Sequence, residues 1–256
     1  MVNKSPLRYP GGKTRAIKTL EAYINKYFPN ETVIVSPFFG GGSFELHMID
    51  KGYTVYANDL FQPLYTFWKT TQVNSEEISA LIRSLMPIDK TKFHEYRTNI
   101  LTSENDIQIA AYYYIINRCS FSGSTFCGGF SSQASTGRLN DSSLKTLESV
   151  DLTNVHISNE DCIDFLKTHP DGIIYADPPY YISNYIYGRD GDLHKQFDHE
   201  SFATEIKKHR KWILSYNDCE YIRNLYSDCR IFEESWSYGM NSTKKSSEIV
   251  ILPAET

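Results

Sequence analysis

The feature that most constrains the fold is a strand, turn, helix and strand pattern in residues 32–59. Residues 32–35 are apolar and predict a strand, which runs into the turn Pro37-Phe38-Phe39-Gly40-Gly41-Gly42-Ser43. A helix is expected over residues 45–51, and residues 53–57 predict a second strand that ends in Asn58-Asp59. A pattern of this kind begins an α/β sheet.

The glycine turn and Asp59 together predict a Rossmann-like sheet that binds a nucleoside cofactor. Glycines allow the backbone to approach a ligand closely. Asp59 follows Gly42 by 17 residues (59 − 42), near the roughly 20 residues that separate the glycines from the ribose-binding acid in such folds. The alternative for Asp59 is a cap on a helix that begins near Phe61.

A second motif, Ala176-Asp177-Pro178-Pro179-Tyr180, follows the apolar run of residues 172–175. Two prolines lack N–H donors, so the chain should leave the sheet here in a rigid, extended turn. The Asp177 carboxylate and the Pro178 carbonyl are then two acceptors beside the Tyr180 ring. That combination suits a planar amino group on a flat heterocycle, although Asp-Pro is also a common turn signal.

Composition restricts the class of protein. The 256 residues are 41% hydrophobic and 22% charged, enough for one large α/β domain or one domain with an insertion. The net charge of −5 gives no general signal for nucleic acid, but residues 1–28 hold six lysines and arginines against one glutamate. Five cysteines without a C-x-x-C pair, and a polar N-terminus, favour a cytoplasmic protein with free thiols and no membrane segment.

A helical insertion interrupts the α/β pattern. Helices are predicted over residues 64–73, 75–86, 90–101 and 107–118 with no strand between them. The expected division is an α/β domain of residues 1–60 and 150–256, and a helical insertion of residues 61–149. Residues 117–132 form a small, polar segment with interleaved phenylalanines, which suits phosphate and base contacts. Residues 181–197 are expected to be a loop over the site.

Taken together and in order, these motifs resemble those of the Dam-type, α-group DNA adenine-N6 methyltransferases over nearly the whole chain. The matching segments are Tyr9-Pro10-Gly11-Gly12-Lys13, the glycine turn, Ala57-Asn58-Asp59, Asn117-Arg118-Cys119-Ser120-Phe121-Ser122-Gly123 and Asp177-Pro178-Pro179-Tyr180. The family usually has an acid before the Pro-Phe of the glycine turn, where this chain has Ser36. In the family, this acid is expected to contact the methionine amino group of the cofactor S-adenosyl-L-methionine, and Ser36 has no carboxylate for that contact.

The resemblance implies a Rossmann-like methyltransferase that uses S-adenosyl-L-methionine and no metal. Such an enzyme flips an adenine out of a specific duplex DNA sequence and methylates its N6. The resemblance also implies that residues 1–60 and 150–256 are the catalytic domain and residues 61–149 the helical DNA target-recognition insertion. The catalytic residues it implies are Asp177, Pro178 and Tyr180. The cofactor-binding residues it implies are Tyr9, Lys13, Phe38, Gly40, Gly42, Asp59, Asp161, Cys162 and Asp177. The DNA-binding residues it implies are Arg118, Ser120, Phe121 and Ser122, with Phe121 entering the base stack or, alternatively, anchoring the loop.

Other functions stay open at this point. The acceptor could be RNA, a cytosine amino group or a protein amide, or the chain could be a non-catalytic DNA-recognition subunit with the same fold. A nicotinamide dehydrogenase lacks support because the turn is not a G-x-G-x-x-G. Double-stranded DNA is the expected partner, with a restriction endonuclease as a functional rather than a stable partner. One chain carries every motif, so a monomer is sufficient.

Overall fold

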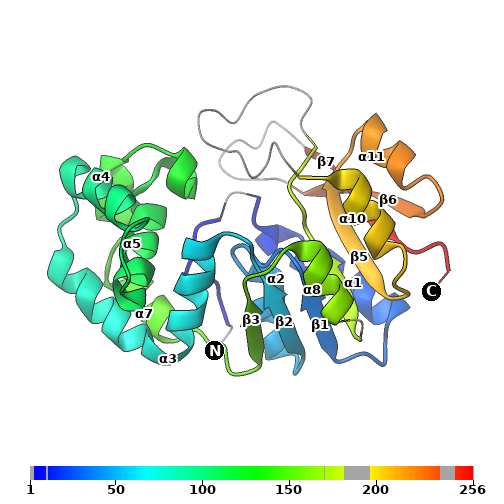
Figure 1. Cartoon of the computed structure of the whole chain (residues 1–256), viewed down its shortest axis with the longest axis horizontal. Coiled ribbons are helices and arrows are strands. Elements are labelled where there is room, and N and C mark those ends of the chain that lie inside the picture. Colours follow the sequence, from blue (N-terminus) through cyan, green and yellow to red (C-terminus); the bar gives the residue numbers. More distant parts are fainter. Residues whose placement is uncertain (1–2, 10, 170, 182–196, 237–245, 256) are drawn as a thin grey trace.

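The computed structural model describes residues 3–9, 11–169, 171–181, 197–236 and 246–255 (Figure 1). Most of residues 181–197, the segment predicted as a loop over the site, lies outside these ranges. The described chain forms a seven-stranded sheet flanked by helices. Its strands are β1 (Val33–Ser36), β2 (Thr54–Asn58), β3 (Val155–Ser158), β4 (Ile173–Ala176), β5 (Trp212–Asn217), β6 (Arg230–Trp236) and β7 (Ser246–Leu252).

The order of the strands places the ends of β1 and β4 side by side. The sheet runs β3-β2-β1-β4-β5-β7-β6, and β7 alone among these seven strands runs antiparallel to the other six. From β1 the chain proceeds to β2 on one side, and it later returns to β4 on the other. Ligands of open α/β sheets bind at such a switch point, beyond the carboxyl ends of the strands. The predicted Rossmann-like fold is confirmed.

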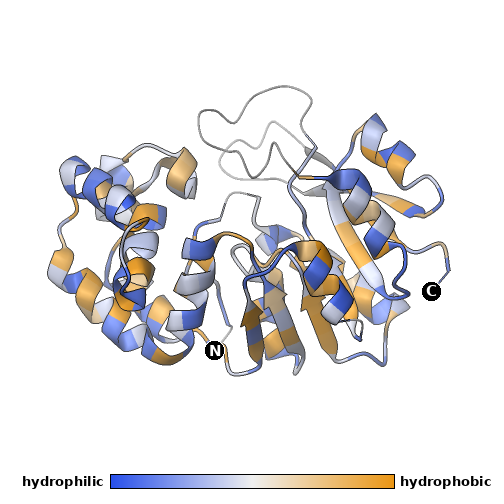
Figure 2. Ribbon diagram, in the orientation of Figure 1, coloured by the Kyte–Doolittle hydropathy of each residue, from blue (hydrophilic) through white to orange (hydrophobic). Residues whose placement is uncertain are grey.

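Both faces of the sheet are buried, as a parallel sheet requires. Successive residues of the central strands enter opposite hydrophobic clusters: Ile34 joins one cluster and Val35 the other. The first face is covered by α1 (Ile17–Tyr27) and α2 (Ser43–Asp50), and the second by α8 (Cys162–Thr168), α10 (His199–Ile206) and α11 (Glu220–Leu225). Figure 2 shows the apolar strands between amphipathic helices.

The insertion forms a helical region beside β3, at the left of Figure 1. It consists of α3 (Gln62–Leu85), α4 (Lys90–Asn99), α5 (Asp106–Cys119), α6 (Ser132–Gly137) and α7 (Asp141–Glu148). The two helices expected over residues 64–73 and 75–86 together make up α3, and the break between them is present as a non-helical backbone conformation at Asn74. The sequence patterns did not predict α6 and α7, whose starts are capped by Ser131 and Asn140.

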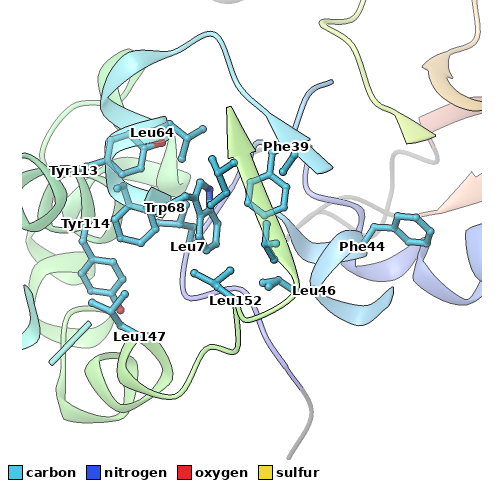
Figure 3. Packing of buried hydrophobic residues seen from close by; sticks show 14 of the residues in the cluster. Leu7, Phe39, Phe44, Leu46, Leu64, Trp68, Tyr113, Tyr114, Leu147 and Leu152 are labelled. Atoms are coloured by element: carbon cyan, nitrogen blue, oxygen red, sulfur yellow. The ribbon is translucent and has the colours of Figure 1, made fainter. Parts of the chain in front are cut away.

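Trp68 anchors the helical region to the glycine turn. Its ring is fully buried, lies 5.0 Å from the ring of Phe39, and donates from Nε1 to the Gly40 carbonyl at 2.9 Å (Figure 3). Phe67 beside it packs against Tyr113 and Tyr114 of α5. Full burial of a phenylalanine side chain contributes about 1.5–3 kcal/mol. This packing therefore fixes the helices relative to the turn that begins the site.

Hydrogen bonds and turns set the starts of two further helices. Helix α10 begins at His199 because Asp198 accepts a hydrogen bond from the Ser201 N–H at 2.9 Å. Helix α1 follows directly after the 3₁₀ turn η1 (Lys13–Arg15). In the part of the chain that the structure describes, no helix is both long and apolar enough to span a bilayer.

Candidate active site

The Asp177 carboxylate lies at the carboxyl end of β4 and is held by two side chains from distant parts of the sequence. Lys13 Nζ donates to both carboxylate oxygens at 2.6 Å, and Ser215 Oγ donates to Oδ1 at 3.0 Å. The Lys13 side chain is 3% exposed and that of Asp177 is 22% exposed. A carboxylate has about four lone-pair positions. These three hydrogen bonds therefore fix its orientation and leave one lone-pair position for a further donor.

Tyr180 is held by the same group of side chains. Its hydroxyl accepts from Lys13 Nζ at 2.9 Å and donates to Glu248 Oε2 of β7 at 2.7 Å. Lys13 Nζ also lies 5.1 Å from the centre of the Tyr180 ring. Asp177 and Tyr180, predicted to act together, are thus linked through Lys13, and Lys13 itself was predicted from the N-terminal motif.

The glycine turn after β1 is covered by Tyr9. Gly40 and Gly42 have φ of +50° and +63°, a region that favours glycine. A Cβ on Gly41 would lie 2.6 Å from Tyr9 Cβ, closer than real Cβ atoms approach. Tyr9 itself is 41% exposed. The turn therefore requires glycine partly because an aromatic ring rests on its backbone.

Asp59 joins the glycine turn to the end of β2. Its Oδ2 accepts from the Gly40 N–H at 2.9 Å and its Oδ1 from the Phe61 N–H at 3.0 Å. Burial raises the pKa of Asp59 to about 6, although these two backbone hydrogen bonds oppose the shift. The alternative role expected for Asp59 was a cap on the helix near Phe61, but α3 has no side-chain cap, and the bond to the Phe61 N–H lies in the turn before the helix. The bond to Gly40 places the carboxylate at the glycine turn.

The remaining predicted cofactor residues lie around the ends of β1 and β3. Phe38 packs edge-on against Phe202, with ring centres 5.3 Å apart. Asp161 is exposed and accepts from the Ile163 N–H at 2.8 Å, which caps α8, while Cys162 is buried. Asn58 joins the segments, because its amide donates to the carbonyls of Pro37 and Glu160 at 3.2 and 3.0 Å.

The side chain of Asn117 forms hydrogen bonds that hold the predicted DNA-recognition loop. Its side chain is fully buried, accepts from the Arg8 N–H at 2.9 Å and donates to the Arg8 carbonyl at 2.8 Å. Ser120 is also fully buried; its hydroxyl donates to the Asn117 carbonyl at 3.1 Å and accepts from the Thr125 N–H at 3.0 Å. These bonds give Ser120 a part in shaping the loop.

Phe121 and Ser122 lie at the surface of this loop. Phe121 is 68% exposed, and Ser122 adopts φ of +55°. Phe126 and Phe130, by contrast, are partly buried against the core. Phe126 lies edge-on to Phe61, 5.3 Å away. Phe121 therefore differs from the loop's other two phenylalanines in its exposure.

Three arginines line a hollow of about 250 Å³ beside the loop. Arg8, Arg118 and Arg138 face it together with polar residues at the start of α7. Arg8 Nη1 and Arg118 Nε are buried without a hydrogen-bond partner among the described residues. Burial, and then the neighbouring charges of Arg138 and Arg118, lower the pKa of Arg8. The hollow thus concentrates positive charge in a protein of negative net charge.

Sequence reasoning missed several residues of the site. Ser215 could have been found from topology, because Ala176 pairs with Leu214 and the next residues must lie side by side. Glu248 comes from the antiparallel strand, whose position no local pattern indicates. Glu45, whose Oε1 accepts from Ser36 Oγ at 2.6 Å, is a buried acid in a helix that begins beside the site.

A mostly parallel sheet with these features at its switch point defines a Rossmann-like methyltransferase. The sequence matches the family described as D12 class N6 adenine-specific DNA methyltransferase over residues 9–240, and the chain belongs to this family. A crystal structure of a “putative methylase” from Haemophilus influenzae aligns with 94% of this chain and 89% of its own length, at 12% identity and a TM-score of 0.38. No curated protein matches the chain.

Proposed function

We propose that this protein transfers a methyl group from S-adenosyl-L-methionine to N6 of adenine within a specific sequence of duplex DNA. The observation that carries the proposal is the Asp177–Tyr180 turn at the switch point of the sheet, with Asp177 and Tyr180 held by Lys13. The family supplies DNA as the substrate and adenine N6 as the acceptor. The donor, the base flipping and the sequence specificity are our inference.

The donor set fits a nucleoside cofactor with an amino-acid tail. Asp59 offers a partly buried carboxylate for ribose hydroxyls, beside Gly40 and Gly41, whose backbone lies against the ring of Tyr9. Tyr9, Lys13, Phe38, Gly40 and Gly42 lie on or next to this turn, and Asp161 and Cys162 lie at the start of α8, where an adenine edge would be contacted. Within the described residues, no cluster of His, Cys, Asp and Glu is arranged to hold a metal ion.

The residues of the Asp177 turn would act on the adenine amino group. The N6 lone pair is delocalised into the ring and is a weak nucleophile. If the Asp177 carboxylate and the Pro178 carbonyl accept hydrogen bonds from its two N–H groups, N6 moves towards tetrahedral geometry and the charge that develops there is stabilised. Tyr180 would stack on the base and fix its plane, which assists through positioning. The cofactor, when bound, supplies an activated methyl group.

The arginine hollow supports contact with the phosphates of duplex DNA. Arg138 is exposed and has no ion pair among the described residues, so replacing it should not disturb the fold. We expect Arg138→Ala to weaken DNA binding at all sequences alike and to reduce the slope of log K against log salt by about 1. Fluorescence anisotropy between 50 and 300 mM salt measures this, with Lys145→Ala on α7 as the control. An unchanged slope would remove Arg138 from the DNA surface.

Phe121 is proposed to enter the base stack when the target adenine rotates out. Stacking on an aromatic side chain is worth about 1–3 kcal/mol, so Phe121→Ala should lower the flipped population about fivefold or more. Fluorescence of 2-aminopurine at the target position reports flipping, and cofactor binding should not change. Cys127→Ala, an exposed residue of the same loop, is the control. Equal 2-aminopurine signals in both variants and the wild type would contradict this assignment.

The proposed activity is tested by sequencing DNA from cells that express the chain, with a method that detects N6-methyladenine. Methylation of adenine within one sequence motif is the expected result. If a folded, expressed protein leaves DNA unmodified, transfer of labelled methyl groups to RNA and protein pools then tests the other acceptors. Failure of the purified protein to bind S-adenosyl-L-methionine would favour a non-catalytic DNA-recognition subunit.

The same proposal covers assembly. Every residue assigned to the site comes from one chain, so we infer that a monomer is sufficient. We also infer that any restriction endonuclease acts as a functional partner on the same DNA sequence rather than in a stable complex. Sedimentation of the active enzyme with and without DNA tests the first inference, and a requirement for a dimer in single-turnover assays would contradict it.

A further inference from the structure

A buried carboxylate next to the Asp177 turn has no part in the mechanism above. Glu45 lies in the first turn of α2, directly after the glycine turn, and is 3% exposed. Its Oε1 is 2.6 Å from Ser36 Oγ, and Ser36 is itself fully buried at the carboxyl end of β1. Both residues therefore lie at the switch point between β1 and β4.

Burial and two charged neighbours act on the pKa of the Glu45 carboxylate. The negative charge of Asp177 raises this pKa, and the positive charge of Lys13 lowers it. Lys13 Nζ, however, lies 2.6 Å from both oxygens of Asp177 and 2.9 Å from the Tyr180 hydroxyl. Burial, the largest cause, raises the pKa of Glu45 to about 7. The charged form of such a buried acid is stabilised when a ligand places a cation beside it.

The proposed cofactor carries two cationic groups at its methionine end, the α-ammonium and the sulfonium. Resting on the proposed function, we infer that Glu45, oriented by Ser36, binds the α-ammonium group of S-adenosyl-L-methionine. An ammonium has three donors and no acceptor, which matches a carboxylate that accepts from the Ser36 hydroxyl and from its own backbone N–H and has lone pairs left over. Glu45 is then a cofactor-binding residue, and Ser36 a positioning residue.

Three ligands separate the possible roles of Glu45. S-Adenosylmethionine has both cationic groups, S-adenosylhomocysteine keeps only the ammonium, and 5′-methylthioadenosine has neither. Glu45→Gln retains the shape and the hydrogen bond to Ser36 but removes the charge. We expect calorimetry at pH 8 to show at least tenfold weaker binding of the first two ligands and less than a threefold change for the third. Ser36→Ala should give the same pattern with a smaller loss.

Each other outcome overturns the inference. An equal loss for all three ligands means that Glu45 only supports the shape of the site, and a loss confined to S-adenosylmethionine means that it faces the sulfonium. No loss at all removes it from the cofactor site. Circular dichroism and the melting temperature verify folding, with Glu76→Gln on the exposed side of α3 as the matched control. If the wild type binds none of the ligands, the proposed function fails as well, so the two failures are distinguishable.

Discussion

Replacing Asp177 with alanine is expected to lower the rate of methyl transfer by about 10²- to 10³-fold or more, the range for losing one acceptor or donor at a developing charge. The carboxylate is the acceptor proposed for the target amino group. Single-turnover transfer from labelled cofactor to DNA measures the effect. The chain should keep its fold, because Asp177 lies in a turn beyond β4 rather than in the core.

The contacts of Asp177 suggest a second variant and a control. Alanine leaves the Lys13 ammonium, whose side chain is 3% exposed, without its carboxylate, and an uncompensated buried charge is costly. Asp177→Asn keeps one acceptor oxygen and a similar shape, and it should lose activity with a smaller change in melting temperature. Ser215→Ala removes one hydrogen bond to Asp177 and should cost less than tenfold. Activity within tenfold of the wild type in both Asp177 variants would contradict the proposed mechanism.

Local sequence patterns predicted the parts of the site that are contiguous in the chain. The unit from β1 to Asp59 and the turn after β4 each combine an apolar run with proline or glycine, so a short segment contains the whole signal. The helices α6 and α7 were not predicted because they are short and rich in serine and threonine. Their starts depend on caps such as Asn140 and Ser143, which bond each other reciprocally.

The contacts between segments could not be predicted in the same way. Lys13 and Asp177 are 164 residues apart, and only the strand order brings the N-terminal 3₁₀ turn to the end of β4. Glu45 lies at a helical position that reads as an ordinary polar residue, and its burial follows from the approach of Ser36. Such pairings depend on tertiary geometry, which single-sequence periodicity does not contain.

Replacing Asp59 should have a comparably large effect, on cofactor binding rather than on the chemical step. Hydrogen bonds to a charged group contribute about 1.5–3 kcal/mol each, so losing the bonds proposed for the two ribose hydroxyls should weaken binding about 100-fold or more. Because 5′-methylthioadenosine also contains ribose, Asp59→Asn should weaken its binding as much as that of S-adenosylmethionine. This differs from the pattern expected for Glu45→Gln.

The pH dependence gives an independent test of Asp59. Its pKa is raised from 3.8 to about 6, so the native state binds the proton more tightly than the unfolded chain. The resulting stabilisation is complete below pH 3.8 and is lost as pH rises through about 6. Asp59→Asn should remove this component from the melting temperature of the unliganded protein.

Ligand affinity should show the opposite trend, because the proposed ribose contact needs the carboxylate. Affinity of the wild type for 5′-methylthioadenosine should rise between pH 5 and pH 7, while that of Asp59→Asn should stay flat. This ligand lacks the ammonium assigned to Glu45, so titration of Glu45 should contribute little to the difference. If both proteins show the same pH profile, Asp59 holds Gly40 and Phe61 in place without contacting the ribose.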